Sequence, residues 1–434
     1  MDKMADVLGR AGAWCGQNKY LSAIKNAFQN FMPLTIAGAI GVLWCNVLVN
    51  ETTGLGMFFK PIMALDFLNP AFQAVNFCTI SCITVGITLG IAQEIGVWNM
   101  GAERAGYIPG LVGLAAWLSV TNTSHMVKGA KEAFTGVAGN ELGATGLFTG
   151  MIIGVLSVEL FCFFEKQDAL NIKMPEQVPP GVARAFEVLV PATITLIITA
   201  CIGSACYNLT GLYLNDVIKN GVQGPLGAVG ATIPGVMIIY LVIMLFWLVG
   251  IHGNNMLSAV KEALFTPLAL ENVEAFNKGE TPKNIINMYF LQMCGEFGGS
   301  GVTIGLVIAI MIFGKREDNK AIASLSLVPG LFNINETVTF GIPMVLNPIL
   351  GIPFVFACLV TILVGYVLTV IGFCPVACLT VPWTTPPIVF GFLACGANVM
   401  GAVTQAILIV VSTVIYVPFL ISYEKYQNKQ AAEV

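Results

Sequence analysis

The most informative polar side chains of this sequence stand between long apolar stretches. Asn333, Asn335 and Glu336 follow a Pro-Gly pair and precede a Gly-Ile-Pro segment, in a chain that is only 10% charged. A carboxylate in apolar surroundings is costly unless it has a partner, so Glu336 suggests a function. Because no Lys or Arg occurs between Lys320 and Lys425, we favour a ligand hydroxyl as that partner over a structural ion pair.

A second polar segment follows the apolar run that contains Trp247. His252 is flanked by glycines and is followed by Asn254 and a second Asn. Glycines let the backbone open, and an imidazole and carboxamides can bind neutral hydroxyl groups. The simpler alternative is that His252 caps a helix end at the membrane interface. Trp247 is placed to lie against the apolar face of a sugar ring.

Two further segments are unsuited to an ordinary helix. Gly298, Gly299 and Ser300 belong to a run too rich in glycine for a helix interior. Backbone groups exposed next to a half-helix form a polar binding surface in a membrane, although helix packing through small residues explains the glycines equally well. Glu296, in the same run, is also compatible with an interfacial position. Trp383 lies among three prolines, which suits either stacking on a sugar or an interfacial aromatic belt.

These residue types favour a neutral polyhydroxylated ligand over an ion. Asn, His and Glu provide directional hydrogen bonds and Trp a flat apolar face, while no cluster of intramembrane carboxylates indicates an ion pump. The 12 cysteines show no metal-ligand spacing, and the sequence has no nucleotide-binding Gly-Lys-Ser/Thr motif and no basic patch with interleaved aromatics. We therefore predict no metal, no cofactor and no nucleic-acid partner.

The elements that position these side chains are predicted to be membrane helices. Hydrophobic residues make up 56% of the chain, a composition that excludes a soluble globular protein. Continuous apolar runs indicate helices, because lipid cannot satisfy an open strand edge and barrel strands would alternate. About nine such stretches occur, at 32–48, 72–92, 107–120, 147–164, 188–209, 233–249, 302–313, 353–373 and 402–421, with shorter pieces around 325–350 and 388–399. The tip that carries Glu336 suits a re-entrant hairpin.

Charge distribution predicts the orientation. The amino end, 1–31, has four basic residues and apolar residues at helical spacing, which is typical of an amphipathic surface helix and not of a signal peptide. The positive-inside rule places that end, the loop 165–184 and the carboxy-terminal tail in the cytoplasm. The turn at 315–320 is expected on the same side.

The composition changes near residue 225. Before it the apolar stretches are plain, whereas beyond it they are interrupted by Gly, Pro, Asn and Glu. We therefore divide the chain into residues 1–225 and 226–434 and expect the second part to hold the site. The stretch 257–283 carries too many charges to span a membrane, which predicts interfacial helices and a loop.

These motifs resemble a known family from end to end. It is the membrane-embedded C component of the lactose, cellobiose and diacetylchitobiose class of the bacterial phosphoenolpyruvate:sugar phosphotransferase system. The most specific matches are Phe332-Asn333-Ile334-Asn335-Glu336, Phe340-Gly341-Ile342-Pro343 and Leu346-Asn347-Pro348. Supporting matches are Gly250-Ile251-His252-Gly253, Gly298-Gly299-Ser300-Gly301 and Pro382-Trp383-Thr384-Thr385-Pro386-Pro387.

The resemblance implies a homodimer in the bacterial cytoplasmic membrane, with both termini cytoplasmic. Each chain would have about ten transmembrane helices, an amino-terminal scaffold and dimerisation domain, and a carboxy-terminal transport domain with two re-entrant hairpins. The transport domain would bind a β-linked disaccharide and carry it inward by an elevator-type movement. A B component with a phosphocysteine would then phosphorylate the sugar's 6-hydroxyl. Because the chain ends soon after its last apolar stretch, we expect the A and B components on separate polypeptides.

The same resemblance assigns roles to individual residues. Glu336 and His252 are expected near the 6-hydroxyl as the catalytic pair. Expected sugar-binding residues are Asn254, Gly298, Gly299, Ser300, Asn333, Asn335, Trp247 and Trp383. Two departures stand out: Thr337 replaces the Pro that usually follows the Asn-Glu pair, and residues 396–401 lack the Asp and Arg often found there.

Two other functions remain compatible with the residues. A cation-coupled sugar symporter would take up sugar without phosphoenolpyruvate, and a sugar sensor would bind without transport or phosphorylation. Glu336 is compatible with a general base and with a group that only positions the sugar.

Overall fold

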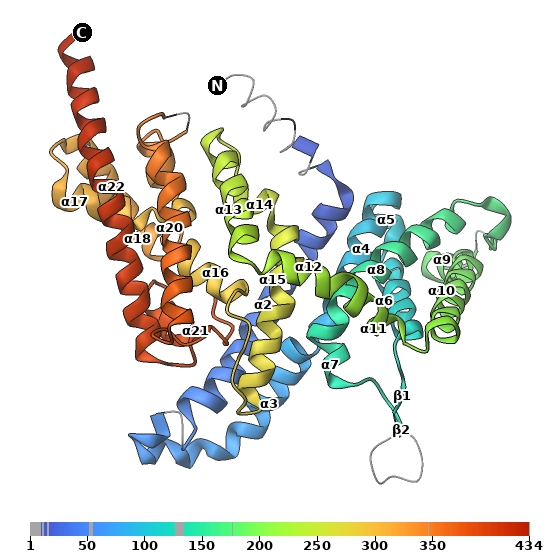
Figure 1. Ribbon diagram of the computed structural model, residues 1–434. Helices are drawn as coiled ribbons and strands as arrows, with labels where there is room; N and C mark the ends of the chain where they lie inside the picture. Colours follow the sequence, from blue (N-terminus) through green and yellow to red (C-terminus); the bar gives the residue numbers. More distant parts are fainter. Residues whose placement is uncertain are drawn as a thin grey trace. The chain divides into compact units, whose positions relative to one another are not determined.

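The computed structural model describes residues 10, 13–14, 17–51, 55–125, 134–175, 177–345 and 347–433. In these residues the chain is nearly all helical, and strands β1 (Ser124–His125) and β2 (Phe134–Thr135) form one short antiparallel pair. The predicted all-α class is therefore confirmed. The chain forms two compact units: Gln17–Gly38 with Val75–Gly227, and a second made chiefly of Ala39–Ala74 and Ala228–Val434 (Figure 1).

The predicted apolar stretches fall on helices. In the described residues, five helical segments are long and apolar enough to cross a membrane, at Lys19–Leu48, Ala144–Glu165, Pro180–Thr210, Gly351–Val370 and Val399–Gln430. The total rises to seven if each of two sharply bent pairs is one span, and α6 (Ile108–Val120) and α13 (Ile233–Leu248) are shorter apolar helices. The expected ten transmembrane helices and two re-entrant hairpins stay predictions. The predicted surface helix at 1–31 lies partly outside the described residues.

Small residues let the helices of the first unit pack closely. A Cβ atom on Gly113 of α6 would lie 2.3 Å from Cβ of Ala92, and one on Gly150 would lie 2.2 Å from Oγ1 of Thr88. Close packing of membrane helices depends on such residues, because lipid provides no hydrophobic drive between helices. The other helical elements of this unit are α4 (Ile83–Met100), α5 (Ala102–Ala105), α7 (Gly139–Leu142), α8 (Ala144–Glu165), η5 (Asp168–Leu170), α9 (Pro180–Glu187), α10 (Leu189–Thr210), α11 (Leu214–Ile218) and η6 (Lys219–Gln223).

An ion-pair network joins three helices of this unit. The Glu165 carboxylate, at the end of α8, accepts from Arg104 of α5 at 2.7 Å and from Arg184 of α9 at 3.0 Å. Both arginines also pair with Glu187. A buried carboxylate is stable when guanidinium groups satisfy it, so this network fixes both ends of the loop 165–184.

The second unit contains every predicted site residue. Its elements from the first half are the end of α2 (Lys19–Leu43), η1 (Trp44–Leu48), η2 (Leu55–Met57), η3 (Lys60–Leu68) and much of α3 (Asn69–Asn76). Those from the second half are α13, α14 (Gly253–Met256), α15 (Ser258–Asn277), α16 (Met288–Gly295), η7 (Ser300–Val302), α17 (Ile304–Phe313), α18 (Glu317–Leu331), α19 (Glu336–Gly341), α20 (Gly351–Val370), α21 (Val389–Ala394) and α22 (Val399–Glu433). Elements α12 (Gly224–Gly230) and η4 (Phe77–Ser81) lie at or next to the limits of the units.

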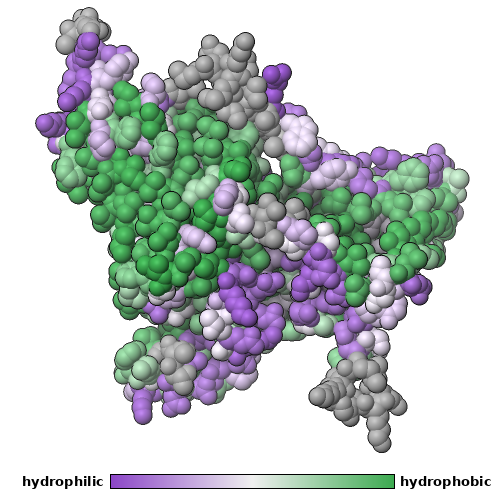
Figure 2. All heavy atoms as spheres, viewed as in Figure 1, coloured by the Kyte–Doolittle hydropathy of each residue, from purple (hydrophilic) through white to green (hydrophobic). Residues whose placement is uncertain are grey.

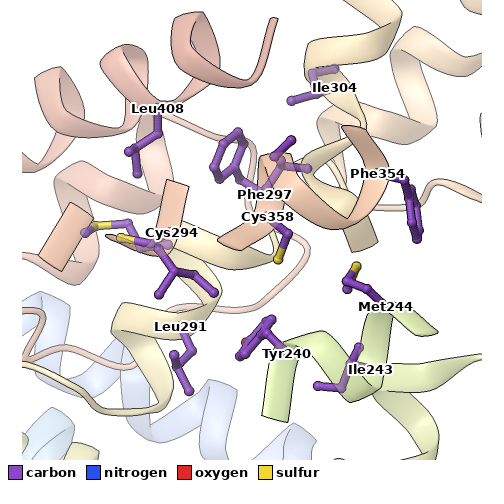
Figure 3. Packing of buried hydrophobic residues seen from close by; sticks show 14 of the residues in the cluster. Tyr240, Ile243, Met244, Leu291, Cys294, Phe297, Ile304, Phe354, Cys358 and Leu408 are labelled. Carbon is purple, nitrogen blue, oxygen red and sulfur yellow. The ribbon is translucent and has the colours of Figure 1, made fainter. Parts of the chain in front are cut away.

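The core of the second unit gathers around α16 and α20. Tyr240, Leu291 and Cys358, from three different helices, are fully buried and lie near one another in Figure 3. Gly295 at the end of α16 allows this approach, because a Cβ there would lie 2.8 Å from Cδ1 of Ile362. The Cys358 thiol donates to the Gly295 carbonyl oxygen at 3.2 Å. The end of α16 is thus held against α20.

The charged stretch 257–283 differs from its prediction. In place of several interfacial helices it forms one 20-residue helix, α15, followed by an irregular segment that leads to α16. Lys261 and Phe265 of this helix are buried. Lys261 pairs with a carboxylate inside the unit, a partner that the prediction did not identify.

Exposed apolar side chains cover parts of both units. Figure 2 shows broad hydrophobic surfaces over the region of α20 and α22 and over α10. On these helices Val410 and Val414 of α22, Phe356 of α20 and Ile197 of α10 are all more than half exposed. Such continuous apolar surfaces suit helices that face lipid.

Candidate functional site

Glu336 and His252 face one another in the second unit. Glu336 is the first residue of α19, and His252 precedes α14. The Nε2 atom of His252 lies 3.9 Å from Oε1 of Glu336, and the two side chains are 38% and 47% exposed. The pair predicted from two segments 84 positions apart is therefore close in space and open to a ligand.

The backbone around His252 fixes how its imidazole is presented. Its Nδ1 atom accepts a hydrogen bond from the Asn255 backbone N–H at 3.3 Å. In the neutral imidazole the proton therefore lies on Nε2, the nitrogen that faces Glu336. Gly253 is needed here, because a Cβ at that position would lie 2.0 Å from the Ile243 carbonyl oxygen.

The gap between the two side chains fits one hydroxyl group. At 3.9 Å the two atoms are too far apart for a direct hydrogen bond. A hydroxyl oxygen beside them can lie about 2.8 Å from both, so that it donates to the carboxylate and accepts from Nε2–H. Glu336 and His252 together can thus bind and polarise a single ligand hydroxyl.

Trp247 packs against the imidazole ring of His252. Its ring centroid lies 4.4 Å from that of His252, with the planes tilted by 47°. The Trp247 side chain is only 2% exposed, and its Nε1 is buried without a partner among the described residues. In this conformation the indole contacts His252, and its contact with a sugar stays a prediction.

Asn333 ties three chain segments together. Its Oδ1 accepts from the Gly298 backbone N–H at 2.6 Å, and its Nδ2 donates to the carbonyl oxygens of Trp383 and Thr385. Asn333 has a φ of 64°, a left-handed conformation that Asn tolerates better than most residues. Both Nδ2 protons are therefore used on the backbone, and the residue acts as a positioning group for the tip that leads to Glu336.

Asn335 holds the same tip against the glycine-rich turn. Its Nδ2 donates to the Ser300 carbonyl oxygen at 2.8 Å, and the residue is 4% exposed. A Cβ on Gly299 would lie 2.5 Å from Cβ of Asn335. Gly298, Gly299 and Gly301 all have positive φ. The sequence predicted a run unsuited to the interior of one helix, and the chain here breaks between α16 and the short η7. The glycines permit close approach to the Glu336 tip.

Trp383 and Asn254 keep groups available for a ligand. The Trp383 side chain is 43% exposed in a segment whose carbonyl oxygens accept from Asn333. The Asn254 Oδ1 is buried and has no hydrogen-bond partner in the described residues. Sugar contacts by either residue stay predictions.

A buried ion pair lies close to this site, and the sequence analysis missed it. Oε1 of Glu296 accepts from the Tyr240 hydroxyl at 2.7 Å and pairs with the Lys261 ammonium group. Glu296 is two positions before Gly298, and Lys261 is nine after His252. The signal was present in the sequence, because two opposite charges in an apolar region each need a partner.

Comparisons with known proteins show the family of this chain. The family model described as "Phosphotransferase system, EIIC" matches residues 25–358. The chain belongs to this family. It is 33% identical to the oligo-β-mannoside-specific EIIC component of Bacillus subtilis, over 98% of this chain and 94% of that one. It is 29% identical to the cellobiose-specific EIIC component of Lactococcus lactis, over 98% of both chains.

A solved structure of the EIIC family is similar throughout. It is the crystal structure of the transporter ChbC, the IIC component of the N,N′-diacetylchitobiose-specific phosphotransferase system. The TM-score is 0.88 at 29% identity, with 97% of both chains covered. The family resemblance drawn from the motifs around Glu336 is therefore confirmed, and this EIIC chain is a membrane protein of the phosphotransferase system.

Proposed function

We propose that this EIIC chain is a permease for a β-linked disaccharide. The sugar binds with its 6-hydroxyl between Glu336 and His252, where a separate B component phosphorylates it. The observation that carries this proposal is the open 3.9 Å pair formed by the two side chains. The names of similar proteins, which specify oligo-β-mannosides, cellobiose and diacetylchitobiose, support a β-linked sugar.

The chemistry requires little of the permease beyond positioning and charge. The P–S bond of the B component's phosphocysteine breaks as a P–O bond forms to the sugar, and a thiolate leaves. Glu336 accepts the hydrogen bond of the 6-hydroxyl, which raises the electron density on the attacking oxygen. The hydroxyl proton ends on Glu336 if this residue is the general base, and on the leaving thiolate if it only positions the sugar. His252 donates through Nε2–H to the same oxygen before transfer and orients it. Trp383 provides an exposed aromatic face for a sugar ring.

The proposed transport step moves residues 226–434 as one body. In this scheme residues 1–225 form the scaffold and the dimer contact in the cytoplasmic membrane, with both termini in the cytoplasm. The contacts within residues 226–434 support a rigid transport domain, because Asn333, Asn335 and Gln405 each hydrogen-bond to the backbone of a distant segment. The A and B components act from the cytoplasmic side.

The experiment is a binding screen of β-linked disaccharides on the purified protein, followed by phosphorylation with its cognate B component. We expect a disaccharide to bind to the purified protein alone. We expect its 6-position to be phosphorylated only when phosphoenolpyruvate and all the phosphotransferase components are present. Uptake into vesicles that needs an ion gradient and no phosphoenolpyruvate would instead establish a cation-coupled symporter. Binding without uptake or phosphorylation would establish a sensor.

A further inference from the structure

The buried pair of Lys261 and Glu296 has hydrogen-bonding capacity that the protein does not use. Lys261 and Tyr240 both contact Oε1 of Glu296. Among the described residues, Oε2 of Glu296 and the remaining protons of Lys261 have no hydrogen-bond partner. The side chains are 18% and 8% exposed, so neither is closed off completely. A buried ion pair is costly unless other groups hydrogen-bond to its remaining donors and acceptors.

A third polar group lies on α16. Gln292 is four positions before Glu296, the residue that follows the end of this helix. The Oε1 atom of Gln292 is buried and also lacks a partner among the described residues. A structural ion pair in a packed core would normally be surrounded by groups that satisfy it. Among the described residues, the Gln292 oxygen and the Lys261–Glu296 pair both keep unused hydrogen-bonding capacity.

Two hydrogen bonds hold the segment on either side of Glu296. The preceding Gly295 is held by Cys358, and the Gly298 backbone N–H is bound by Asn333. Through Asn333, the segment that carries Glu296 is joined to the tip that carries Glu336.

We propose that Lys261 and Glu296 form a second hydroxyl-binding subsite that determines sugar specificity. A carboxylate oxygen beside an ammonium group matches two neighbouring hydroxyls, because one hydroxyl donates to Glu296 while the other accepts from Lys261. The ligand class is a neutral vicinal diol on the same disaccharide whose 6-hydroxyl lies at Glu336. The proposal rests on the function proposed above.

The test measures the affinity of the purified full-length protein for cellobiose and for a series of monodeoxy cellobioses. Glu296→Gln keeps an acceptor for Lys261 and Tyr240 but removes the charge, and we expect the affinity for cellobiose to fall about ten- to a hundredfold. At least one analogue that lacks a hydroxyl other than the 6-hydroxyl should bind wild type weakly. The loss of affinity for this analogue relative to cellobiose should largely disappear in Glu296→Gln and in Lys261→Met. In these variants the side chain that binds the missing hydroxyl is already changed.

Controls separate a binding role from a structural one. Glu262→Gln changes the neighbouring carboxylate, which accepts from Thr266, and should keep the wild-type pattern of affinities. The double variant Lys261→Met with Glu296→Gln avoids leaving one buried charge alone, and it keeps the test valid if a single variant does not fold. Thermal unfolding reports stability for every variant.

Two outcomes overturn different statements. If wild type binds cellobiose but Glu296→Gln or the double variant retains every deoxy penalty in full, the pair is structural and the subsite does not exist. If wild type binds none of cellobiose, diacetylchitobiose and lactose, and none is phosphorylated with the B component, the proposed function fails and the subsite fails with it.

Discussion

The side-chain oxygen of Asn333 accepts a hydrogen bond from the backbone N–H of Gly298 at 2.6 Å, and both residues have positive φ. Most L-residues avoid a positive φ, so the backbone of both segments adopts an unfavoured conformation at this contact. The contact joins the glycine-rich turn after α16 to the tip that begins α19. Glu336 is three positions beyond Asn333, and its orientation depends on this contact.

Asn333→Ala should therefore damage the site and the fold together. The variant loses hydrogen bonds to Gly298, Trp383 and Thr385, each worth about 1 kcal/mol, and it places Ala at a positive φ. We expect a lower melting temperature and sugar affinity reduced at least about tenfold. Asn398→Ala, which removes an acceptor for the Met400 N–H, is the matched control and should cost stability without loss of affinity. Equal affinity losses in the two variants would contradict the positioning role.

Glu336→Gln should nearly abolish phosphorylation. The amide keeps the shape of the side chain but is a poorer acceptor for the sugar hydroxyl, so we expect the rate to fall by about 10²-fold or more and sugar binding to weaken. The size-exclusion profile should be unchanged. A rate assay with the B component checks this, with Glu274→Gln as control because Glu274 pairs with Lys278 at an exposed site. Wild-type rates and affinities in Glu336→Gln would refute the assignment.

Gly299→Ala should be more harmful than its backbone conformation alone explains. Gly299 has φ 88° and ψ −176°, and Gly101 has φ 83° and ψ 155°, so Ala is strained at both positions. Only at Gly299 does the new Cβ meet another residue, 2.5 Å from Cβ of Asn335, whereas nothing lies within 4 Å at Gly101. We expect Gly299→Ala alone to lose sugar binding, with about 1–3 kcal/mol of additional destabilisation. Similar behaviour of the two variants would show that the approach to Asn335 is unimportant.

Trp383→Ala should weaken sugar binding more than it weakens folding. The indole is 43% exposed, so little packing is lost, while a stacking face for a sugar ring is removed. We expect affinity to fall about three- to tenfold with a small change in melting temperature. Trp98→Ala, at a residue that is 57% exposed in the other unit, should change neither. Unchanged affinity in Trp383→Ala would assign that residue to an interfacial belt.

The meeting of Glu336 with His252 was within reach of sequence reasoning. Each is a rare polar residue in a Gly- or Pro-bounded break, and isolated groups of this kind in a membrane gather where a ligand binds. The all-α class followed from the same patterns, because continuous apolar runs leave helices as the plausible element.

The roles of Asn333 and Lys261 were beyond that reasoning. Sugar binding by Asn333 stays a prediction, and the structure adds a positioning role, because its amide protons are directed at carbonyl oxygens 50 and 52 positions away. The sequence predicted an interfacial helix around Lys261 but named no partner for it, and its partner Glu296 lies 35 positions on. Such long-range pairings depend on how the helices pack, which local patterns do not encode.

The contacts of Asn333 also bear on the biogenesis of the protein. The Asn333 amide donates to the carbonyl oxygens of Trp383 and Thr385. These two residues are synthesised after α20, so the contact cannot form until then. Proteins are synthesised and fold from the amino end, so the earlier helices can insert while the site is still unformed. A chain stalled before residue 383 would contain both Glu336 and His252, yet its binding site would lack the segment that holds the tip in place.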